Sequence, residues 1–422
     1  MNDRHVSGSW DVVDLLAEIA DVGRDPVRGG YSRHLFEPAE LELRAWFTRR
    51  AQALGLTVEP DRNGNIWAHW GEPGPGTVAT GSHLDSVPGG GALDGPLGVA
   101  SALSAVARLK ADGFVPARPV AVVTFAEEEG SRFGIACLGS KLLAGAVDPA
   151  AIAARTDSDG VSFAAAARAT GVLDPAAIGR DDERLASLGC LVELHVEQGR
   201  GLTDLGAPVA VASTILAHGR WRLTFTGEGN HAGATPMAGR SDPLVAASGA
   251  VLAARDLAAA RDNPADGVNA RATVGRIAVL PGGTNVIASQ VDAWLDVRGD
   301  TDAETRSLVA EIAAAIQIAA AKQLCRLEIT RESYLREVVF DEALGDRLRT
   351  VLENQPGCAT VPVLPTGAGH DAGVLAAELP TAMLFVRNPT GVSHAPEETA
   401  TDADCRTGVA ALTAVLAALA SS

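Results

Sequence analysis

Residues 77–111 read TVATGSHLDSVPGGGALDGPLGVASALSAVARLKA: a short apolar run, a glycine-rich loop and an alanine-rich stretch typical of a helix. Further short apolar runs follow at 119–125, 191–195 and 381–386. Another helical stretch lies at 136–146. Strands that alternate with helices predict an α/β fold, with a mostly parallel sheet and helices on both faces.

The middle of the chain has a different order. From Arg220 onward the sequence predicts a strand, a helix, two strands, a long helix and a strand. This β-α-β-β-α-β order is typical of a compact, ferredoxin-like unit. We therefore expect a discontinuous domain of residues 1–213 and 332–422, with an inserted domain of residues 214–331. The open edge of the inserted sheet leaves room for pairing with a second copy, which is compatible with an oligomer.

Composition and charge narrow the class of protein. Hydrophobic residues make up 47% of the 422 and charged ones 21%, which excludes a disordered chain. The net charge of −17 disfavours nucleic acid and anionic membranes as partners. The first residues do not resemble a secretion signal, and we expect a cytoplasmic protein. The five cysteines form no C-x-x-C pair, so neither a disulfide framework nor a thiolate zinc site is indicated.

Polar residues follow the first predicted strand. His83 ends that strand, and Asp85 and Asp94 lie in the glycine-rich loop beyond it. Ligands of α/β sheets bind beyond the carboxyl ends of the strands, and a His with an Asp there suits a divalent metal. We expect the Asp85 carboxylate to accept the other ring N–H of His83. Taken alone, the motif is equally compatible with a capped turn and a structural histidine.

Three adjacent carboxylates, Glu127, Glu128 and Glu129, follow the apolar run PVAVVTF. They repel one another at the end of a buried strand unless cations neutralise them. The alternative is a solvated charge run. Successive side chains of an extended segment point to opposite sides, so at most two of the three are expected to share a site.

Two more strand ends carry histidines. His195 lies in HVEQG, close to Gln198, and His394 lies in GVSHAPEE. Any one of these histidines is more often structural than a ligand. Four strand ends that each present a histidine or carboxylate together predict a metal site.

Eight motifs occur in a fixed order: GSHLDSVPGGGALDGPLGV, EEEGSRFG, ELHVEQG, GEGNHAGATPM, NVIA, DVRGD, GAGHDA and GVSHAPEE. With them the chain resembles, over nearly its whole length, the L-carbamoylase, allantoate amidohydrolase and β-ureidopropionase family of the dinuclear aminoacylase and carboxypeptidase clan. The resemblance implies two divalent ions, one held by His83, Asp94 and His195, the other by Asp94, Glu129 and His394. It further implies that Glu128 is the general base and that a cis peptide follows Asp94.

The same resemblance makes the insert a lid and dimerisation domain. His231, Asn285 and Arg298, together with Gln198, match positions that grip the carboxylate and the reacting carbonyl of the substrate. In the family His231 reaches the site of the neighbouring subunit, where it would stabilise an oxyanion. An arginine suits a carboxylate because its planar fork donates two parallel hydrogen bonds, although a surface salt bridge is the alternative for Arg298.

The expected reaction is hydrolysis of the ureido or carbamoyl C–N bond of a small carboxylate-bearing molecule, an N-carbamoyl-L-amino acid or allantoate, with release of ammonia and carbon dioxide. The alternative is an N-acyl amino acid hydrolase or peptidase of the same clan. Oxygen and imidazole ligands accept Zn, Mn, Co or Ni alike. Thr366 and the loop RNPTG depart from the family pattern and bear on the choice of substrate. His370 and Asp371 in GAGHDA are expected to play a structural or supporting role.

Overall fold

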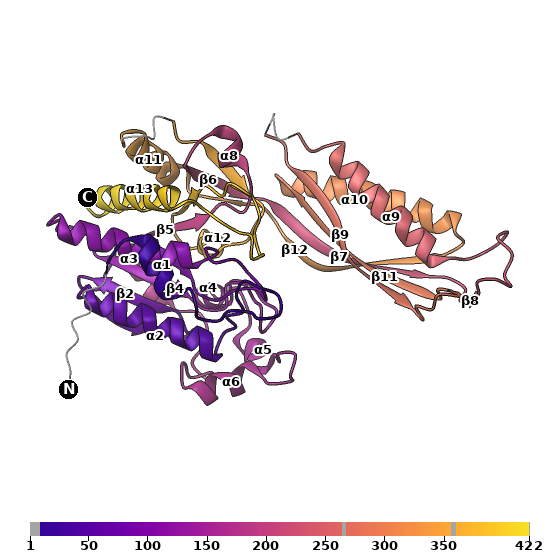
Figure 1. The fold of residues 1–422 in the computed structure, drawn as a ribbon, viewed down its shortest axis with the longest axis horizontal. Coiled ribbons are helices and arrows are strands. Elements are labelled where there is room, and N and C mark those ends of the chain that lie inside the picture. Colours follow the sequence, from indigo (N-terminus) through magenta and orange to yellow (C-terminus); the bar gives the residue numbers. More distant parts are fainter. Residues whose placement is uncertain (1–8, 264–266, 356–359, 422) are drawn as a thin grey trace. The chain divides into compact units, whose positions relative to one another are not determined.

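The computed structural model describes residues 9–263, 267–355 and 360–421 (Figure 1). These residues form two compact units, one comprising the described residues up to Ser213 and from Val339, the other Thr214–Val338. The sequence predicted the second boundary at 331, but the last strand of the insert, β12 (Arg326–Leu335), continues past it. Of the five cysteines, Cys358 lies outside the described residues.

The larger unit contains most of the helices and one large sheet. Its helices are α1 (Val12–Glu18), α2 (Pro38–Ala53), α3 (Pro96–Ala111), α4 (Leu138–Ala144), α5 (Pro149–Ala154), α6 (Phe163–Thr170), α7 (Asp182–Ser187), α8 (Gly201–Leu205), α11 (Glu342–Glu353), α12 (Asp371–Leu375) and α13 (Asp402–Ala420). Its strands are β1 (Thr57–Pro60), β2 (Ile66–Trp70), β3 (Thr77–His83), β4 (Val120–Phe125), β5 (Leu188–Val196), β6 (Val209–Ile215), β13 (Val338–Val339), β14 (Val363–Thr366) and β15 (Thr381–Val386).

The strand order of this sheet is β1-β2-β4-β3-β5-β15-β6-β13, with β14 paired to β6. The four central strands, β4, β3, β5 and β15, run parallel, whereas β1 is antiparallel to β2, β2 to β4, and β6 to β15. The fold is therefore a mixed α/β fold whose sheet is parallel at its centre. Strand β4 follows β3 along the chain and pairs with one side of it, whereas β5 pairs with the other side. The strand order therefore changes direction between β3 and β5. Ligands of such sheets bind at the carboxyl ends of the strands that flank this point.

Helices cover both faces of the sheet. Val192 and Leu194 of β5 pack in one core with residues of α3 and α13. The side chain between them, Glu193, points to the other face and accepts a hydrogen bond from the backbone N–H of Ala372 in α12. The predicted arrangement of helices on two sides of the sheet is thus present around β5.

Among the described residues, α13 alone is long and apolar enough to cross a membrane, yet 61% of its apolar window is buried within the protein. It packs against α3, α11 and β15. These contacts identify α13 as a core helix.

The smaller unit has the predicted element order: β7 (Ala217–Thr226), α9 (Pro243–Ala259), β9 (Ala270–Leu280), β11 (Gln290–Gly299), α10 (Asp302–Lys322) and β12. Its four strands form an antiparallel sheet in the order β12-β7-β11-β9. Helices α9 and α10 lie side by side on one face (Figure 1). Alternate residues, such as Leu223, Phe225 and Leu295, are buried beneath them. Two short strands, β8 (Asn230–His231) and β10 (Val286–Ile287), pair with each other.

Candidate metal centre

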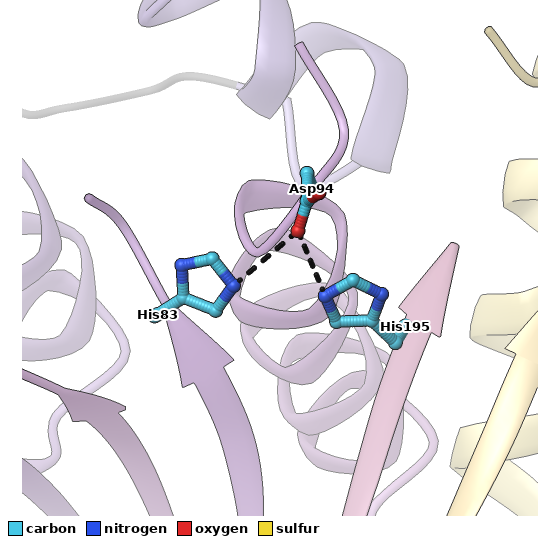
Figure 2. A group of neighbouring side chains, drawn as sticks. All are labelled: His83, Asp94 and His195. Carbon is cyan, nitrogen blue, oxygen red and sulfur yellow. Dashed lines mark ion pairs between the residues drawn. The ribbon is translucent and has the colours of Figure 1, made fainter. Parts of the chain in front are cut away.

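Two histidines at the ends of adjacent parallel strands point at the same carboxylate (Figure 2). The Nε2 atom of His83, on β3, lies 3.5 Å from Oδ1 of Asp94, and Nε2 of His195, on β5, lies 3.2 Å from it. Asp94 precedes α3 and is followed by Gly95, whose φ is +85°. A Cβ atom at Gly95 would lie 2.5 Å from the ring of His83, so the close approach of this loop to the histidine requires glycine.

The second oxygen of Asp94 faces a different pair of residues. Nε2 of His394 lies 3.4 Å from Asp94 Oδ2 and 3.5 Å from Glu129 Oε2. Asp94 thus belongs to two groups, one with His83 and His195 and one with Glu129 and His394, and within each group the potential ligand atoms all lie within 4.8 Å of one another. The structure brings together the five side chains that the resemblance assigns to metal binding.

The three consecutive glutamates point in different directions. The backbone at Glu127 is left-handed, with φ +53°, and its carboxylate turns away to accept hydrogen bonds from the N–H groups of Arg132 and Phe133. Glu128 and Glu129 face the histidines: Glu128 Oε2 lies 3.7 Å from Nε2 of His83. Two of the three carboxylates therefore share the site, in line with the limit expected from the sequence.

Asp85 plays a different part from the expected one, because its carboxylate does not accept the ring N–H of His83. Its backbone carbonyl, 3.1 Å from Nδ1 of His83, is the hydrogen-bond partner of the ring, whereas its carboxylate lies 3.6 Å away. The carboxylate accepts the backbone N–H groups of Glu128 and Glu129 at 3.2 and 3.0 Å. Because those two donors occupy its oxygens, the carboxylate orients the glutamate turn, and the histidine tautomer is set by the carbonyl.

The expected cis peptide after Asp94 is wrong for this structure. Among the described residues, the one cis bond joins Leu280 and Pro281. The turn after Asp94 is made by the positive φ of Gly95, a conformation that glycine adopts without a cis bond.

Asp94 is held by Gln198, which the sequence singled out, and by Glu398 and Ser393, which it did not. The carboxylate of Glu398 accepts the backbone N–H groups of Leu93 and Asp94 at 3.0 and 2.9 Å. Ser393 donates to Asp94 Oδ2 at 3.3 Å, and Gln198 donates to the same oxygen at 2.9 Å. Glu398 and Ser393 lie in GVSHAPEE, and only their proximity to His394 along the chain could have drawn attention to them.

The buried carboxylates of the cluster repel one another unless positive charge lies nearby. Burial, and then the charge of Asp94, raises the pKa of Glu129 to about 8. Burial also raises the pKa of Glu128 well above its ordinary value. For His83, burial lowers the pKa, but nearby carboxylates, Glu128 first among them, outweigh it and raise the pKa well above its usual range. Buried carboxylates packed this densely need cations nearby.

The donor set fits divalent ions. Nε2 of His83, Nε2 of His195 and Oε1 of Glu129 are buried and have no hydrogen-bond partner. Buried polar atoms are normally paired, and these atoms face one another in a cluster of imidazoles and carboxylates. That combination of ligands suits divalent metals of the Zn and Mn type.

His370 and Asp371 support the cluster from α12. The ring of His370 packs edge-on against His195, with the centroids 4.6 Å apart, and burial lowers the pKa of His370 well below its usual range. The carboxylate of Asp371 accepts a hydrogen bond from Ser140. These contacts place His370 directly behind a predicted metal ligand.

The residues predicted in the insert occupy two separate places. His231 and Asn285 line an open pocket of about 460 Å³ beside the short β8–β10 pair. The backbone N–H groups of Gly233 and Ala234 each donate to Nδ1 of His231 at 3.1 Å. Because Nδ1 accepts, the neutral ring carries its proton on Nε2, which is left as a donor.

Arg298 lies near the other end of β11, where it pairs with Asp296 at 2.8 Å. Arg298 lies eight positions along β11 from Gln290, which is at the β10 end of the strand, a span of roughly 26 Å. The structure therefore does not bring Arg298 next to His231 and Asn285 within one chain.

Comparison with known proteins agrees with the motifs. Residues 79–418 match the model of peptidase family M20/M25/M40. The chain is 36% identical to an N-carbamoyl-L-amino acid amidohydrolase of Geobacillus stearothermophilus, over 94% of this chain and 95% of that protein. It is 32% identical to the allantoate amidohydrolase of Escherichia coli (strain K12), over 97% of both. A crystal structure of an amidase of the hydantoinase/carbamoylase family from Burkholderia multivorans superimposes with a TM-score of 0.86, at 30% identity and 98% coverage of each chain.

Proposed function

The chain belongs to peptidase family M20/M25/M40, and from that membership we propose that it is a metal-dependent amidohydrolase that cleaves the carbamoyl or ureido C–N bond of a small carboxylate-bearing substrate. The reaction releases ammonia and carbon dioxide. The relatives named for N-carbamoyl-L-amino acids and for allantoate support this non-peptide chemistry. The observation that carries the proposal is the position of Asp94, whose two oxygens face two different sets of ligand atoms.

Two divalent ions fit the cluster. His83, Asp94 and His195 would hold one, and Asp94, Glu129 and His394 the other. When bound, such ions polarise the scissile carbonyl and lower the pKa of the attacking water. Zn, Mn, Co and Ni are all compatible with these ligands.

Glu128 is the general base of the proposal. It is buried, and its Oε2 faces the histidine cluster, 3.7 Å from His83. A carboxylate in that position takes a proton from the attacking water and returns it to the leaving nitrogen. Asp85 assists by holding the backbone of Glu128 and Glu129.

His231 supplies the oxyanion donor. Its Nε2–H is available because Nδ1 is engaged by the two backbone N–H groups of the following turn. A preorganised donor of this kind stabilises the negative charge that develops on the carbonyl oxygen. Asn285 lines the same pocket and contributes an amide beside it.

Arg298 and Gln198 bind the substrate. The guanidinium of Arg298 would exchange Asp296 for the substrate carboxylate, in a two-pronged contact. Gln198 already donates to Asp94 and Ser393, so its amide lies beside the predicted metal ligands. In that position it can orient the reacting group.

The separation of Arg298 from His231 supports a homodimer. An N-carbamoyl amino acid is about as long as two extended residues, roughly 7 Å, whereas the span along β11 is several times larger. One copy of the rigid sheet therefore cannot offer both side chains to one molecule. We assign the smaller unit as a ferredoxin-like lid and dimerisation domain that presents His231 and Asn285 to the site of the second copy.

The chemistry of the site predicts the class of substrate, and the net charge of the chain predicts which partners are disfavoured. A small carboxylate-bearing ureido or carbamoyl compound is the substrate, and the net charge of −17 disfavours nucleic acid and membranes. The cytoplasmic location stays a prediction.

A turnover screen of the metal-loaded protein tests the proposal. The substrates are N-carbamoyl-L-amino acids, allantoate, ureidopropionate and N-acetyl amino acids, and the readouts are ammonia, carbon dioxide and released acid. We expect release of ammonia and carbon dioxide from at least one ureido compound. Turnover confined to the N-acetyl amino acids, with release of the acyl group as a free acid, would overturn it.

A further inference from the structure

Cys137 contacts the proposed base twice. Its Sγ atom donates to Oε1 of Glu128 at 3.1 Å, and its backbone N–H donates to the carbonyl oxygen of Glu128 at 2.6 Å. Both residues are buried, at 3% and 6% exposure. Cys137 is itself fixed, because its carbonyl accepts a hydrogen bond from Ser140 at 3.1 Å. The thiol that contacts Glu128 is therefore itself held in place by hydrogen bonds.

The two oxygens of Glu128 have different neighbours. Oε1 faces the thiol, and Oε2 faces Nε2 of His83 at 3.7 Å. A carboxylate held at one oxygen has little freedom to rotate about its last bond, so the other oxygen stays directed at the reaction site. A base must be within hydrogen-bond reach of the proton that it removes, which makes this orientation matter for the rate.

The thiol can act only as a donor toward this carboxylate. Burial, and then the charge of Glu128, raises the pKa of the Cys137 thiol well above its ordinary value, so the sulfur keeps its proton. An S–H group is a weak donor, and it anchors an oxygen without lowering its basicity as much as an O–H or N–H group would.

The backbone at Cys137 is the second sign that its side chain is needed. It has φ +53° and ψ +41° as the N-cap of α4, a left-handed conformation that favours glycine. A residue with a side chain is disfavoured at such a position unless the side chain contributes something that glycine cannot. Here the contribution is the contact with Glu128.

We infer that Cys137 is a positioning residue that holds Oε1 of Glu128 so that Oε2 faces the substrate site. This inference rests on the proposed function, since it takes Glu128 to be the base. It also gives a role to one of the five cysteines, for which the sequence indicated neither a disulfide nor a zinc site.

The first test compares substitutions at Cys137 in the metal-loaded enzyme. Cys137→Ala should lower kcat about tenfold with KM and metal content unchanged, because the lost contact orients the base and does not bind substrate. Cys137→Gly, which suits the left-handed backbone, should lower kcat equally and guards against a folding defect in the alanine variant. Cys137→Ser retains a donor and should stay within about threefold of the wild type.

The matched control is Cys405→Ala, which truncates an equally buried cysteine in α13 and should leave kcat unchanged. Full kcat in both Cys137→Ala and Cys137→Gly would overturn the inference. So would a serine variant as slow as the alanine variant, because the donor would then be irrelevant.

A double-mutant cycle separates this inference from the proposed function. In a Glu128→Gln background, Cys137→Ala should change the residual kcat by less than about twofold, since the thiol acts through the carboxylate. A repeated tenfold loss would show that Cys137 acts structurally and would overturn the inference. If Glu128→Gln alone keeps wild-type kcat, the assignment of the base in the proposed function fails, whatever the cysteine variants do.

Discussion

Asp94 is buried and receives hydrogen bonds from Gln198 and Ser393, while His231 is exposed on a two-residue strand beside an open pocket. The larger unit holds its polar residues at the ends of parallel strands. There, side chains such as Asp85 and Glu398 accept hydrogen bonds from the backbone of neighbouring loops. The smaller unit holds His231 and Asn285 beside the short β8–β10 pair and Arg298 near the far end of β11. The first group of residues comes together within one chain, whereas we propose that the second acts in the site of another copy.

The largest effect should come from the residue shared by both ligand groups. Asp94→Asn should remove both metals and abolish turnover, by at least about 10⁴-fold, because the attacking water ionises near neutral pH only beside the cations. Metal analysis and turnover measure both effects together.

Chelation of the wild type should reproduce the loss, and added divalent ions should restore activity in the wild type but not in Asp94→Asn. Full activity in a verified metal-free sample contradicts the two-metal proposal.

The three consecutive glutamates give the next comparison, because they have the same side chain but point in different directions. Glu128→Gln should keep the metals and lose about 10³-fold or more in kcat. Glu129→Gln should lose metal as well as activity. Glu127→Gln is the matched control, since its side chain accepts from Arg132 and Phe133 outside the cluster and a glutamine oxygen can still do so. Loss of metal in Glu128→Gln and its retention in Glu129→Gln would mean that the two roles are reversed.

His231→Ala tests the smaller unit. It should lower kcat by about 10²-fold while KM changes little, because an oxyanion donor acts mainly in the transition state. A steady-state comparison with the wild type separates the two constants, and a change confined to KM would argue for substrate binding alone.

Subunit exchange tests whether His231 acts in the second copy. Equal mixing of inactive His231→Ala and Glu128→Gln proteins should restore up to about a quarter of wild-type activity, since half of the dimers are hybrids with one intact site each. A mixture that stays inactive after exchange is demonstrated by mass-tagged subunits would mean that the histidine does not cross between copies.

Arg298→Ala should have the smallest effect on chemistry. We expect KM to rise roughly ten- to a hundredfold with little change in kcat, because a carboxylate anchor binds ground state and transition state alike. Arg220→Ala is the control, since Arg220 also pairs with Asp296, at 3.3 Å, from the neighbouring strand. Equal kinetics for the two variants would mean that Arg298 is only a surface ion pair.

The periodicity of the chain predicted most of the elements that matter. The strand at 381–386 has the predicted bounds, a helix follows the glycine-rich loop as predicted, and the insert has the predicted order of strands and helices. Hydrophobic pattern is local, so it identifies elements well. It does not report strand neighbours, and the antiparallel edges formed by β1, β2 and β6 were not anticipated.

The predicted ligands come together because parallel strands deliver their carboxyl ends to one edge. His83 and His195 could be paired in advance on that ground, and the structure places both within 3.5 Å of Asp94. The hydrogen bonds of Asp85 could not be predicted, since they depend on where the glutamate turn folds back. Cys137 and Glu398 were missed for a similar reason, because their hydrogen bonds depend on how the loops around Glu128 and Asp94 fold.

Residue types and their order along the chain were sufficient to predict the family, an α/β catalytic unit with an insert and the set of candidate ligands. These features depend on apolar periodicity and on motifs a few residues long, which a single sequence displays directly. Three-dimensional packing was needed to learn that Asp94 faces two ligand groups, that Glu127 turns away while Glu128 is held by Cys137, and that His231 and Arg298 stand a strand length apart. Those features depend on directions and distances between side chains, which emerge only when remote segments pack against one another.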